Sequence, residues 1–165
     1  MKPALLVIDI QKAFFRFDDF TTKSLNGTIE YANAAIAIFR EKGYPVISIQ
    51  HMDVEDGLIP GSDGFDLPES LDIEPDDLHF HKTYGNALIK TGLHEKLKDL
   101  EVDTLIICGF RAENCILSTY RGAEDMDLFP ILLRGGIAGG DPDRIKFVED
   151  INEVISIWAL ERLLP

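Results

Sequence analysis

The sequence predicts an α/β protein, a three-layer α/β/α sandwich built on a doubly wound, mainly parallel sheet. Short apolar runs of strand length alternate with longer segments that carry helical spacing, and no internal repeat interrupts this alternation. The predicted strands are aliphatic throughout, as is typical of parallel strands covered by helices on both faces. Right-handed crossovers between such strands place helices on both sides of the sheet.

The first third of the chain predicts two strands and one long helix. The apolar run Ala4–Asp9 is a strand that ends in a carboxylate, and Pro45–Gln50 is a second, buried strand. Between them, Leu25–Lys42 has apolar residues at helical spacing, and Gly43 is a suitable helix stop.

The middle of the chain opens on an acidic, irregular stretch. Asp53–Asp77 contains glycines and prolines and shows little periodicity, which indicates a long loop. Loops of this length in compact domains are usually functional or mobile. Leu78–His81 follows as the third strand, and Thr91–Leu100 is a helix opened by a Thr91 cap.

The last third of the chain repeats the strand–helix alternation. Thr104–Cys108 is the fourth strand, a helix then carries Cys115 and runs to about Met126, and Phe129–Leu133 is the fifth strand. The remaining elements are a helix, a short strand and a final helix capped by Ser156: Asp141–Asp150, Glu153–Ile155 and a helix ending at Leu164. We expect residues 1–165 to form a single domain, long enough for a substantial core.

Cys115 carries the strongest indication of chemistry. It stands in the segment CGFRAENCILSTY, where a β-branched run breaks at Gly109 and then becomes helix-like. A thiol there lies at or near the first turn of a helix, where unpaired N–H groups favour a thiolate and can hold a developing oxyanion. By position alone, however, a cysteine is more often a small buried apolar residue.

Two charged residues stand at the ends of other predicted strands. Asp9 closes the first strand, and Lys82 follows the third. Because the carboxyl ends of parallel strands face one crevice, this carboxylate and ammonium can converge with the thiol of Cys115. Taken singly, an Asp at a strand end is usually a turn residue or cap, and a lone Lys is usually solvated.

Three segments carry a resemblance to a known family. They occur in the order LLVIDIQKAF (Leu5–Phe14), KTYGNAL (Lys82–Leu88) and CGFRAENCILSTYRGA (Cys108–Ala123), with apolar strands at compatible spacing between them. Together they resemble the isochorismatase-like cysteine hydrolase superfamily, which includes nicotinamidases and N-carbamoylsarcosine amidohydrolases. The resemblance spans nearly the whole chain and implies the strand order 3-2-1-4-5-6.

The resemblance also implies a set of catalytic groups. The family's Asp, Lys and Cys correspond to Asp9, Lys82 and Cys115. A non-proline cis peptide bond is expected between Phe110 and Arg111, and the backbone N–H groups of Arg111 and Cys115 are expected to form the oxyanion hole.

The expected activity is cysteine-dependent hydrolysis of a C–N bond in a small molecule, of the amide, carbamoyl or ureido type. Lys82, as a nearby cation, would lower the pKa of the thiol, and Asp9 would take the thiol proton and pass it to the leaving amine. The thiolate would form a thioester that water hydrolyses. The residues expected to line a pocket for a small planar amide are Phe14, Phe15, His51 and Tyr84.

Residues next to the nucleophile leave alternatives open. The charge of Glu113, two positions before Cys115, should oppose thiolate formation unless the carboxylate points into solvent. The guanidinium of Arg111 meets either an anionic substrate group or a surface carboxylate, and the sequence does not separate the two. Ala112 stands where relatives commonly have Thr.

The histidines do not complete a zinc site. Nicotinamidases of the family hold zinc through an Asp-x-His pair and a further histidine, whereas this chain has the reversed order His51-Met52-Asp53 and no histidine between Asp53 and His79. One imidazole and one carboxylate are too few ligands for zinc. We therefore expect no metal and no other cofactor, with His51 as a pocket wall.

Composition excludes several classes of partner. A formal net charge of −13 disfavours binding to nucleic acid and to anionic membranes, since both need basic patches. Two cysteines do not suggest a disulfide scaffold, and neither a signal-like N-terminus nor a membrane-spanning apolar run is evident, so we expect a cytoplasmic protein. The partner is expected to be a small-molecule substrate, and the resemblance suggests a homodimer or homotetramer.

Other α/β classes lack their defining residues. A receiver domain needs a cluster of acids where Asp9 stands alone, and a haloacid-dehalogenase phosphatase needs a second acid where Gln11 stands. A dinucleotide-binding module needs a glycine-rich turn after the first strand, which is absent. Two alternatives within the same fold stay open: a catalytically idle binding or oligomeric scaffold, and a metal-dependent amidase of the nicotinamidase type.

Overall fold

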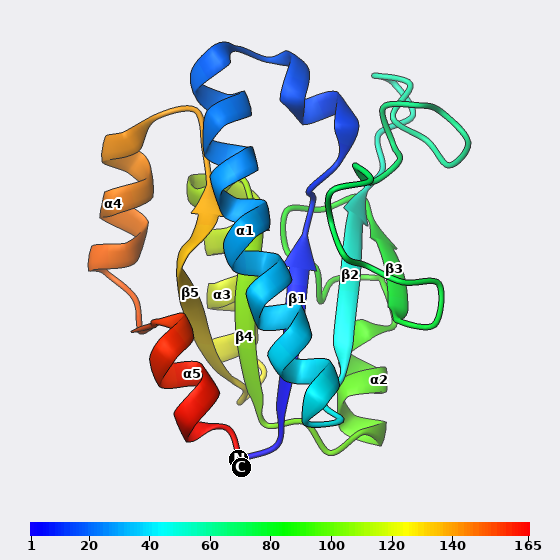
Figure 1. Ribbon diagram of the computed structural model, residues 1–165. Helices are drawn as coiled ribbons and strands as arrows, with labels where there is room; N and C mark the ends of the chain where they lie inside the picture. The colour runs from blue at the N-terminus through cyan, green and yellow to red at the C-terminus, as the bar shows by residue number, and fades with distance from the viewer.

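The computed structural model describes residues 1–165 and contains one six-stranded sheet between layers of helices (Figure 1). Every strand pair is parallel, and the order β3-β2-β1-β4-β5-β6 confirms the predicted order. The strands are β1 (Pro3–Ile8), β2 (Val46–His51), β3 (Leu78–Lys82), β4 (Thr104–Phe110), β5 (Phe129–Ala138) and β6 (Val154–Ile155).

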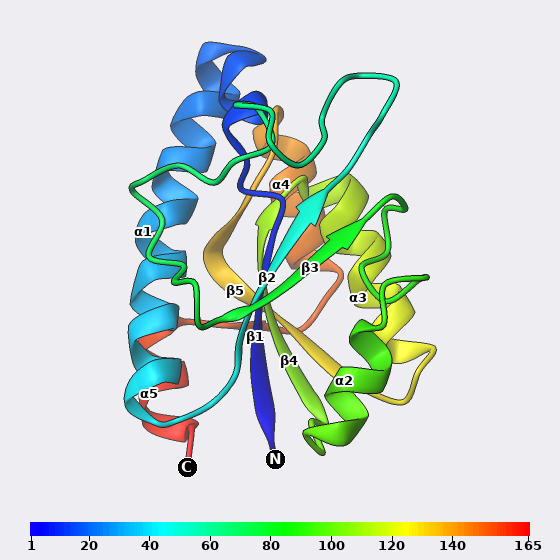
Figure 2. The ribbon, with the colours of Figure 1, turned by 90° about the vertical axis from the view of Figure 1, so that its right-hand side faces the viewer.

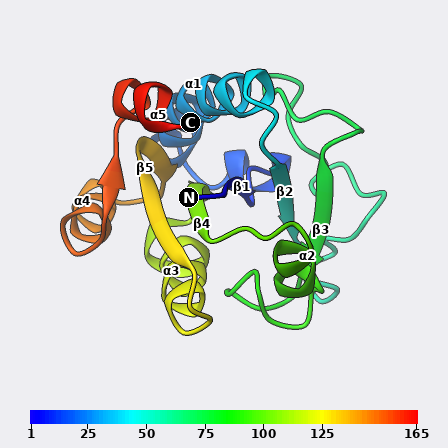
Figure 3. The same ribbon diagram turned by 90° about the horizontal axis from the view of Figure 1, so that it is seen from below.

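Five α-helices cover the sheet: α1 (Asp19–Glu41), α2 (Leu93–Asp99), α3 (Leu117–Glu124), α4 (Pro142–Asp150) and α5 (Ile157–Leu163). Seen from below, α1 and α5 lie on one face of the sheet and α2 and α3 on the other, which is the predicted three-layer sandwich (Figure 3). A 3₁₀ turn, η1 (Lys12–Arg16), follows β1, and a π-helical turn, η2 (Ala112–Ile116), leads into α3. No helix combines the length and the apolar composition needed to cross a bilayer.

The core has two halves because successive strand residues point to opposite faces of the sheet. On β1, Leu6 and Ile8 belong to the half that packs under α2 and α3, whereas Leu5 and Val7 belong to the half under α1. All six residues of β1 are buried, as expected for a central parallel strand.

Helix α1 starts at Asp19, six residues before the predicted start at Leu25. The side chain of Asp18 accepts a hydrogen bond from the Thr21 N–H at 2.8 Å and so caps the helix. Between Asp19 and Leu25 the only apolar residue is Phe20, so this segment adds little to the apolar pattern on which the prediction rested.

Strand β5 continues to Ala138, where the prediction ended it at Leu133. Its pairing with β4 moves from Ile107 opposite Leu132 to Gly109 opposite Ile137, which is a bulge. Gly135, at φ +73°, takes a conformation that other residues adopt with difficulty, and its presence made this part of the chain look like a loop.

Helix α2 begins at Leu93 rather than at Thr91. Gly92 occupies the cap position with left-handed backbone, although the Thr91 hydroxyl oxygen still accepts a hydrogen bond from the Leu93 N–H at 3.2 Å. The predicted Ser156 cap is present, since its hydroxyl oxygen accepts from the Ala159 N–H at 3.2 Å.

The acidic segment 53–77 contains no helix or strand, as predicted. It rises above the carboxyl end of β2 and returns past α1 to the start of β3 (Figure 2). Buried Phe65 anchors it, because its carbonyl oxygen accepts hydrogen bonds from the amides of Gln11, at 3.2 Å, and Gln50, at 2.8 Å.

Candidate active site

Four chain segments bring polar side chains together at the carboxyl edge of the sheet. Asp9 follows β1, His51 ends β2, Lys82 ends β3, and Cys115 lies in η2 after β4. The Asp9 N–H donates to the carbonyl of Ile49 at 2.9 Å, so the chain stays tied to β2 just past the end of β1. The sheet thus positions all four residues at one level.

Gly109 allows β4 to approach β1 closely at this level. A Cβ atom at Gly109, whose φ is +127°, would lie 2.0 Å from the carbonyl oxygen of Ile8. Only glycine fits such an approach and such a backbone angle. The chain can therefore turn from β4 into η2 directly beside Asp9.

Lys82 reaches the site from two strands away. Strands in a sheet lie about 4.8 Å apart, so β3 is roughly 10 Å from β1, and only a long side chain spans that gap. The stem of Lys82 is buried, and the residue is 1% exposed. Its length explains why a lysine stands at this position and not a shorter cation.

The three predicted catalytic side chains meet. Lys82 Nζ lies 2.8 Å from Asp9 Oδ2 and donates to Cys115 Sγ at 3.2 Å. Asp9 is 1% exposed, and its Oδ1 is buried without a hydrogen-bond partner. The peptide bond between Phe110 and Arg111 is cis, as the resemblance implied.

The expected direction of the Cys115 pKa is wrong. Burial, and then the charge of Asp9, raise the pKa of the Cys115 thiol to about 11, and the opposing effect of Lys82 is smaller. Burial also raises the pKa of Asp9, against the effect of Lys82. The resting site therefore holds a neutral thiol beside a base, and not a preformed thiolate.

A cavity of ≈190 Å³ opens onto Cys115. Its lining is Asp9, Phe14, Phe17, His51, Phe110, Arg111, Asn114 and Cys115. Two of the four predicted pocket residues, Phe14 and His51, are in this lining. Phe15 packs instead against the core under α1, and Tyr84 is 47% exposed, with its hydroxyl bonded to Lys90 at 3.1 Å.

Three residues of the lining, Phe17, Phe110 and Asn114, and the buried Gln11 were not among the predicted pocket residues. Phe17 and Phe110 form an aromatic cluster with Phe14, with ring centroids 5.0 to 6.2 Å apart, and Asn114 adds an amide. Gln11 is fully buried and holds the backbone of the neighbouring strand end. Two of these four residues, Gln11 and Asn114, are polar residues inside the matched motifs. Their position in those motifs was the feature of the sequence that could have identified them as site residues.

The Glu113 carboxylate pairs with two guanidinium groups. Its Oε1 accepts from Arg111 Nε at 2.8 Å and from Arg144 at 3.1 Å. The carboxylate charge is thus neutralised by two guanidinium groups and opposes a Cys115 thiolate only weakly. Arg111 meets a protein carboxylate, which was one of the two alternatives, while its side chain still borders the cavity.

The KTYGNAL segment serves to dock β3 against α3. The Ala87 N–H donates to the Thr119 hydroxyl at 3.0 Å, and that hydroxyl donates to the Gly85 carbonyl at 3.4 Å. The Asn86 side chain lies over Gly122, where an added Cβ would come within 2.0 Å of the amide. These contacts fix the segment that follows Lys82 to the helix that follows Cys115.

The site does not fit a metal ion. Ligand atoms of Asp9, His51 and Cys115 lie within 4.8 Å of one another, but the Lys82 ammonium contacts all three, at 2.8, 3.1 and 3.2 Å. A metal ion among these ligands would have to displace that buried cation. Asp53 is not among the ligand atoms that gather there, and its Oδ1 accepts a hydrogen bond from the Glu55 N–H at 2.9 Å.

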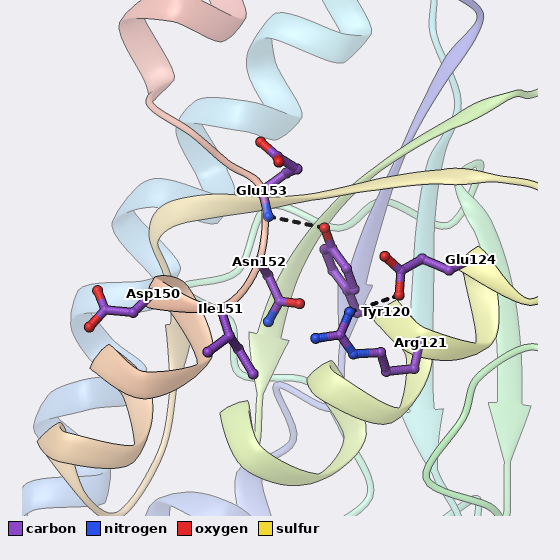
Figure 4. Close-up of a pocket in the computed structure, with 7 residues that line it drawn as sticks. All are labelled: Tyr120, Arg121, Glu124, Asp150, Ile151, Asn152 and Glu153. Carbon is purple, nitrogen blue, oxygen red and sulfur yellow. Dashed lines mark hydrogen bonds and ion pairs between the residues drawn. The ribbon is translucent and has the colours of Figure 1, made fainter.

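A second cavity, of ≈290 Å³, lies between α3 and the connection from α4 to β6 (Figure 4). Arg121 pairs with Glu124 at 2.8 Å, and the Glu153 N–H donates to the Tyr120 hydroxyl at 3.0 Å. Its side chains include no thiol and no imidazole. Of these two cavities, only the first is lined by a thiol and an imidazole.

Solved structures share this fold across almost their whole length. An isochorismatase family protein covers 94% of this chain and 97% of its own, with 29% identity and a TM-score of 0.81. An N-carbamoylsarcosine amidase from Thermoplasma acidophilum (23% identity, 94% and 95% covered, TM-score 0.80) and a zinc complex of pyrazinamidase from Pyrococcus horikoshii (20%, 94% and 99%, 0.81) are also similar. At these last two identities the likeness establishes the fold alone.

Sequence comparison identifies the family. The isochorismatase domain model matches residues 3–148. The uncharacterized isochorismatase family protein YrdC of Bacillus subtilis (strain 168) is 34% identical over 141 residues, covering 83% of this chain and 74% of that protein. The chain therefore belongs to the isochorismatase family.

Proposed function

We propose that this protein hydrolyses a C–N bond of a small amide, carbamoyl or ureido compound through a thioester on Cys115. The observation that carries the proposal is the buried Lys82 ammonium, which contacts both the Asp9 carboxylate and the Cys115 sulfur at the edge of a cavity. A nucleophile, a base within reach and a group that orients both are the parts that covalent catalysis needs.

The chemistry starts from the neutral thiol. As the sulfur attacks the carbonyl carbon, its proton moves to Asp9, and Lys82 stabilises the charge that forms on sulfur. We assign the developing oxyanion to the backbone N–H groups of Arg111 and Cys115. Asp9 then protonates the departing nitrogen, the C–N bond breaks, and a thioester remains.

Hydrolysis of the thioester reverses these roles. Asp9, again a carboxylate, takes a proton from water as the water oxygen attacks the acyl carbon, and the proton returns to the sulfur as the C–S bond breaks. A carboxyl whose pKa is raised by burial is a stronger base than an exposed one, which suits both transfers.

The cavity supports a small, planar substrate. Three phenylalanine rings form its apolar wall, and Asn114 and Arg111 supply polar groups. Its ≈190 Å³ is smaller than the roughly 300–1,000 Å³ typical of drug-sized ligand sites. The names of two similar structures, an N-carbamoylsarcosine amidase and a pyrazinamidase, agree with C–N substrates.

The test is a screen of small primary amides, ureas and carbamoyl acids for release of ammonia. We expect the wild type to hydrolyse at least one of these classes of compound. The Cys115→Ala variant should hydrolyse none of them. Release from no compound in the panel would favour the idle scaffold. The rate of thiol alkylation at a single pH does not separate the two, because a pKa of about 11 leaves the resting thiol only slowly reactive in either case.

Replacing Asp9 with asparagine should move thiol reactivity and turnover in opposite directions. Loss of the Asp9 charge lowers the Cys115 pKa, so alkylation by iodoacetamide at about pH 8 should rise at least about threefold, at tenfold per pKa unit. Hydrolysis should fall by about 10² to 10⁴, because the base is gone. Slower alkylation in Asp9→Asn than in the wild type would contradict the assigned charges, and Cys115→Ala provides the unlabelled control.

Exhaustive chelation should leave hydrolysis within about twofold of its starting rate. The Lys82 ammonium occupies the centre that a metal would need, and the oxyanion donors are backbone groups, so no Lewis acid is required. The measurement is ammonia release before and after removal of metal, and again after addition of zinc. Activity that disappears with chelator and returns with zinc would instead support the nicotinamidase-type alternative.

A further inference from the structure

The buried ammonium of Lys82 has a third partner besides Asp9 and Cys115. Its Nζ lies 3.1 Å from Nδ1 of His51. An ammonium group has three N–H donors, and the contacts at 2.8, 3.1 and 3.2 Å use one donor each. Two of the three acceptors act in the proposed reaction, and the third, His51, has no role in it.

His51 is held rigidly from the backbone. It ends β2, the strand between β1 and β3, and pairs in register with Lys82 (Figure 1). The buried Gln11 amide engages both of its main-chain groups: the His51 N–H donates to Oε1 at 2.7 Å, and Nε2 donates to the His51 carbonyl at 3.0 Å. The Gln11 side chain, which follows β1, thus fixes the backbone position from which the His51 imidazole extends.

The protonation state of His51 follows from its partner. Because an ammonium only donates, Nδ1 must accept, and the ring is therefore neutral with its hydrogen on Nε2. Burial, and then the Lys82 charge, lower the pKa of His51, which agrees with a neutral ring. His51 is thus available as an acceptor at neutral pH.

We propose that His51 is a positioning residue that aims the Lys82 ammonium at the Cys115 sulfur. It takes the single N–H that Asp9 and Cys115 leave over, so the ammonium cannot rotate without losing a hydrogen bond in a buried site. The donor is then already aligned when negative charge develops on sulfur. This inference rests on the proposed role of Cys115 as the nucleophile.

The variants His51→Asn and His51→Leu test the role as a matched pair. The two side chains have the same branched shape, but only asparagine places an acceptor oxygen near the position of Nδ1. The readout is the rate of Cys115 alkylation by iodoacetamide across about pH 7 to 9, where the rate follows the thiolate fraction. Cys108 is fully buried, with a pKa raised to about 12, so Cys115→Ala should show no labelling.

We expect His51→Leu to alkylate about tenfold more slowly than the wild type, corresponding to a rise of one pKa unit when Lys82 is no longer aimed at sulfur. His51→Asn should stay within about threefold of the wild type, and the matched change His79→Asn on the exposed face of β3 should have no effect. Equal rates for His51→Leu and wild type, or equally slow Asn and Leu variants, would overturn the proposal.

Alkylation does not depend on amide hydrolysis, so the two proposals can fail separately. If the Leu and Asn variants differ as expected and no amide is hydrolysed, the positioning role stands and the proposed reaction falls. If amides are hydrolysed and the His51→Leu and His51→Asn variants do not differ, the proposed reaction stands and the positioning role of His51 falls. Where a substrate is found, kcat should follow the alkylation rates while KM changes little, since His51 acts through Lys82.

Discussion

Cys115→Ala should abolish amide hydrolysis, with a loss of about 10⁴-fold or more in kcat, because the covalent intermediate can no longer form. Cys115→Ser should lose at least about 100-fold. Burial already raises the thiol pKa to about 11, and a hydroxyl in the same place is harder still to deprotonate, even with Asp9 as the base. The measurement is ammonia release with the best compound from the screen.

Cys108→Ala is the matched control for this prediction. Cys108 is the other cysteine of the chain, lies fully buried in β4 and points into the core under α1. Its loss should cost some stability by leaving a small void, but should not change the rate of the folded enzyme. Hydrolysis that persists in Cys115→Ala, or that disappears in Cys108→Ala while the fold is retained, would remove Cys115 as the nucleophile.

Lys82→Met should produce the largest loss of stability among the site variants, about 3–5 kcal/mol in the free energy of unfolding. Methionine fills a similar volume but leaves the Asp9 carboxylate buried without the partner now 2.8 Å away. The double variant Asp9→Asn/Lys82→Met removes that unpaired charge and should recover about half of the loss. Urea unfolding of the three proteins measures these differences.

The penalty of Lys82→Met should also depend on pH. The pKa of Asp9 is already raised by burial above its ordinary 3.8, and removal of Lys82 raises it further. In the variant, folded protein binds the Asp9 proton more tightly than unfolded protein does. The stability gained from this proton is therefore fully present below about pH 3.8, the pKa of Asp9 in the unfolded chain, and is lost as the pH rises through the pKa of Asp9 in the folded state. The variant should thus lie closer to the wild type at about pH 4 than at about pH 8. An equal penalty at both pH values would show that Asp9 is not the buried charge responsible.

The polar groups near Cys115 form two separate sets of contacts. Lys82 and Asp9 form a buried ion pair, and the half-buried, neutral His51 ring contacts the same ammonium, whereas Glu113 pairs with Arg111 and Arg144. This separation explains how an acidic residue two positions before Cys115 is tolerated. It also leaves the guanidinium of Arg111 beside the cavity without making it a partner of the sulfur.

The sequence by itself determined the order of the elements and which residues meet at the edge of the sheet. Apolar runs of strand length and helical spacing are local patterns, and parallel strands bring their carboxyl ends together whatever the loops between them do. Asp9, Lys82 and Cys115 therefore could be placed in one site before the fold was seen. The strand order and the cis bond at Phe110–Arg111 came from the matched motifs.

The tertiary structure decided what depends on burial and on distant partners. The cap at Asp18, the bulge at Gly135 and the pairing of Glu113 with Arg144 each require a contact or backbone angle that local periodicity does not encode. The direction of the Cys115 pKa was the clearest case, because desolvation outweighs the nearby ammonium only when the thiol is buried, and burial is a property of the whole packed chain. For the same reason, the contact between His51 and Lys82 could be identified only once β2 and β3 were known to lie side by side in register.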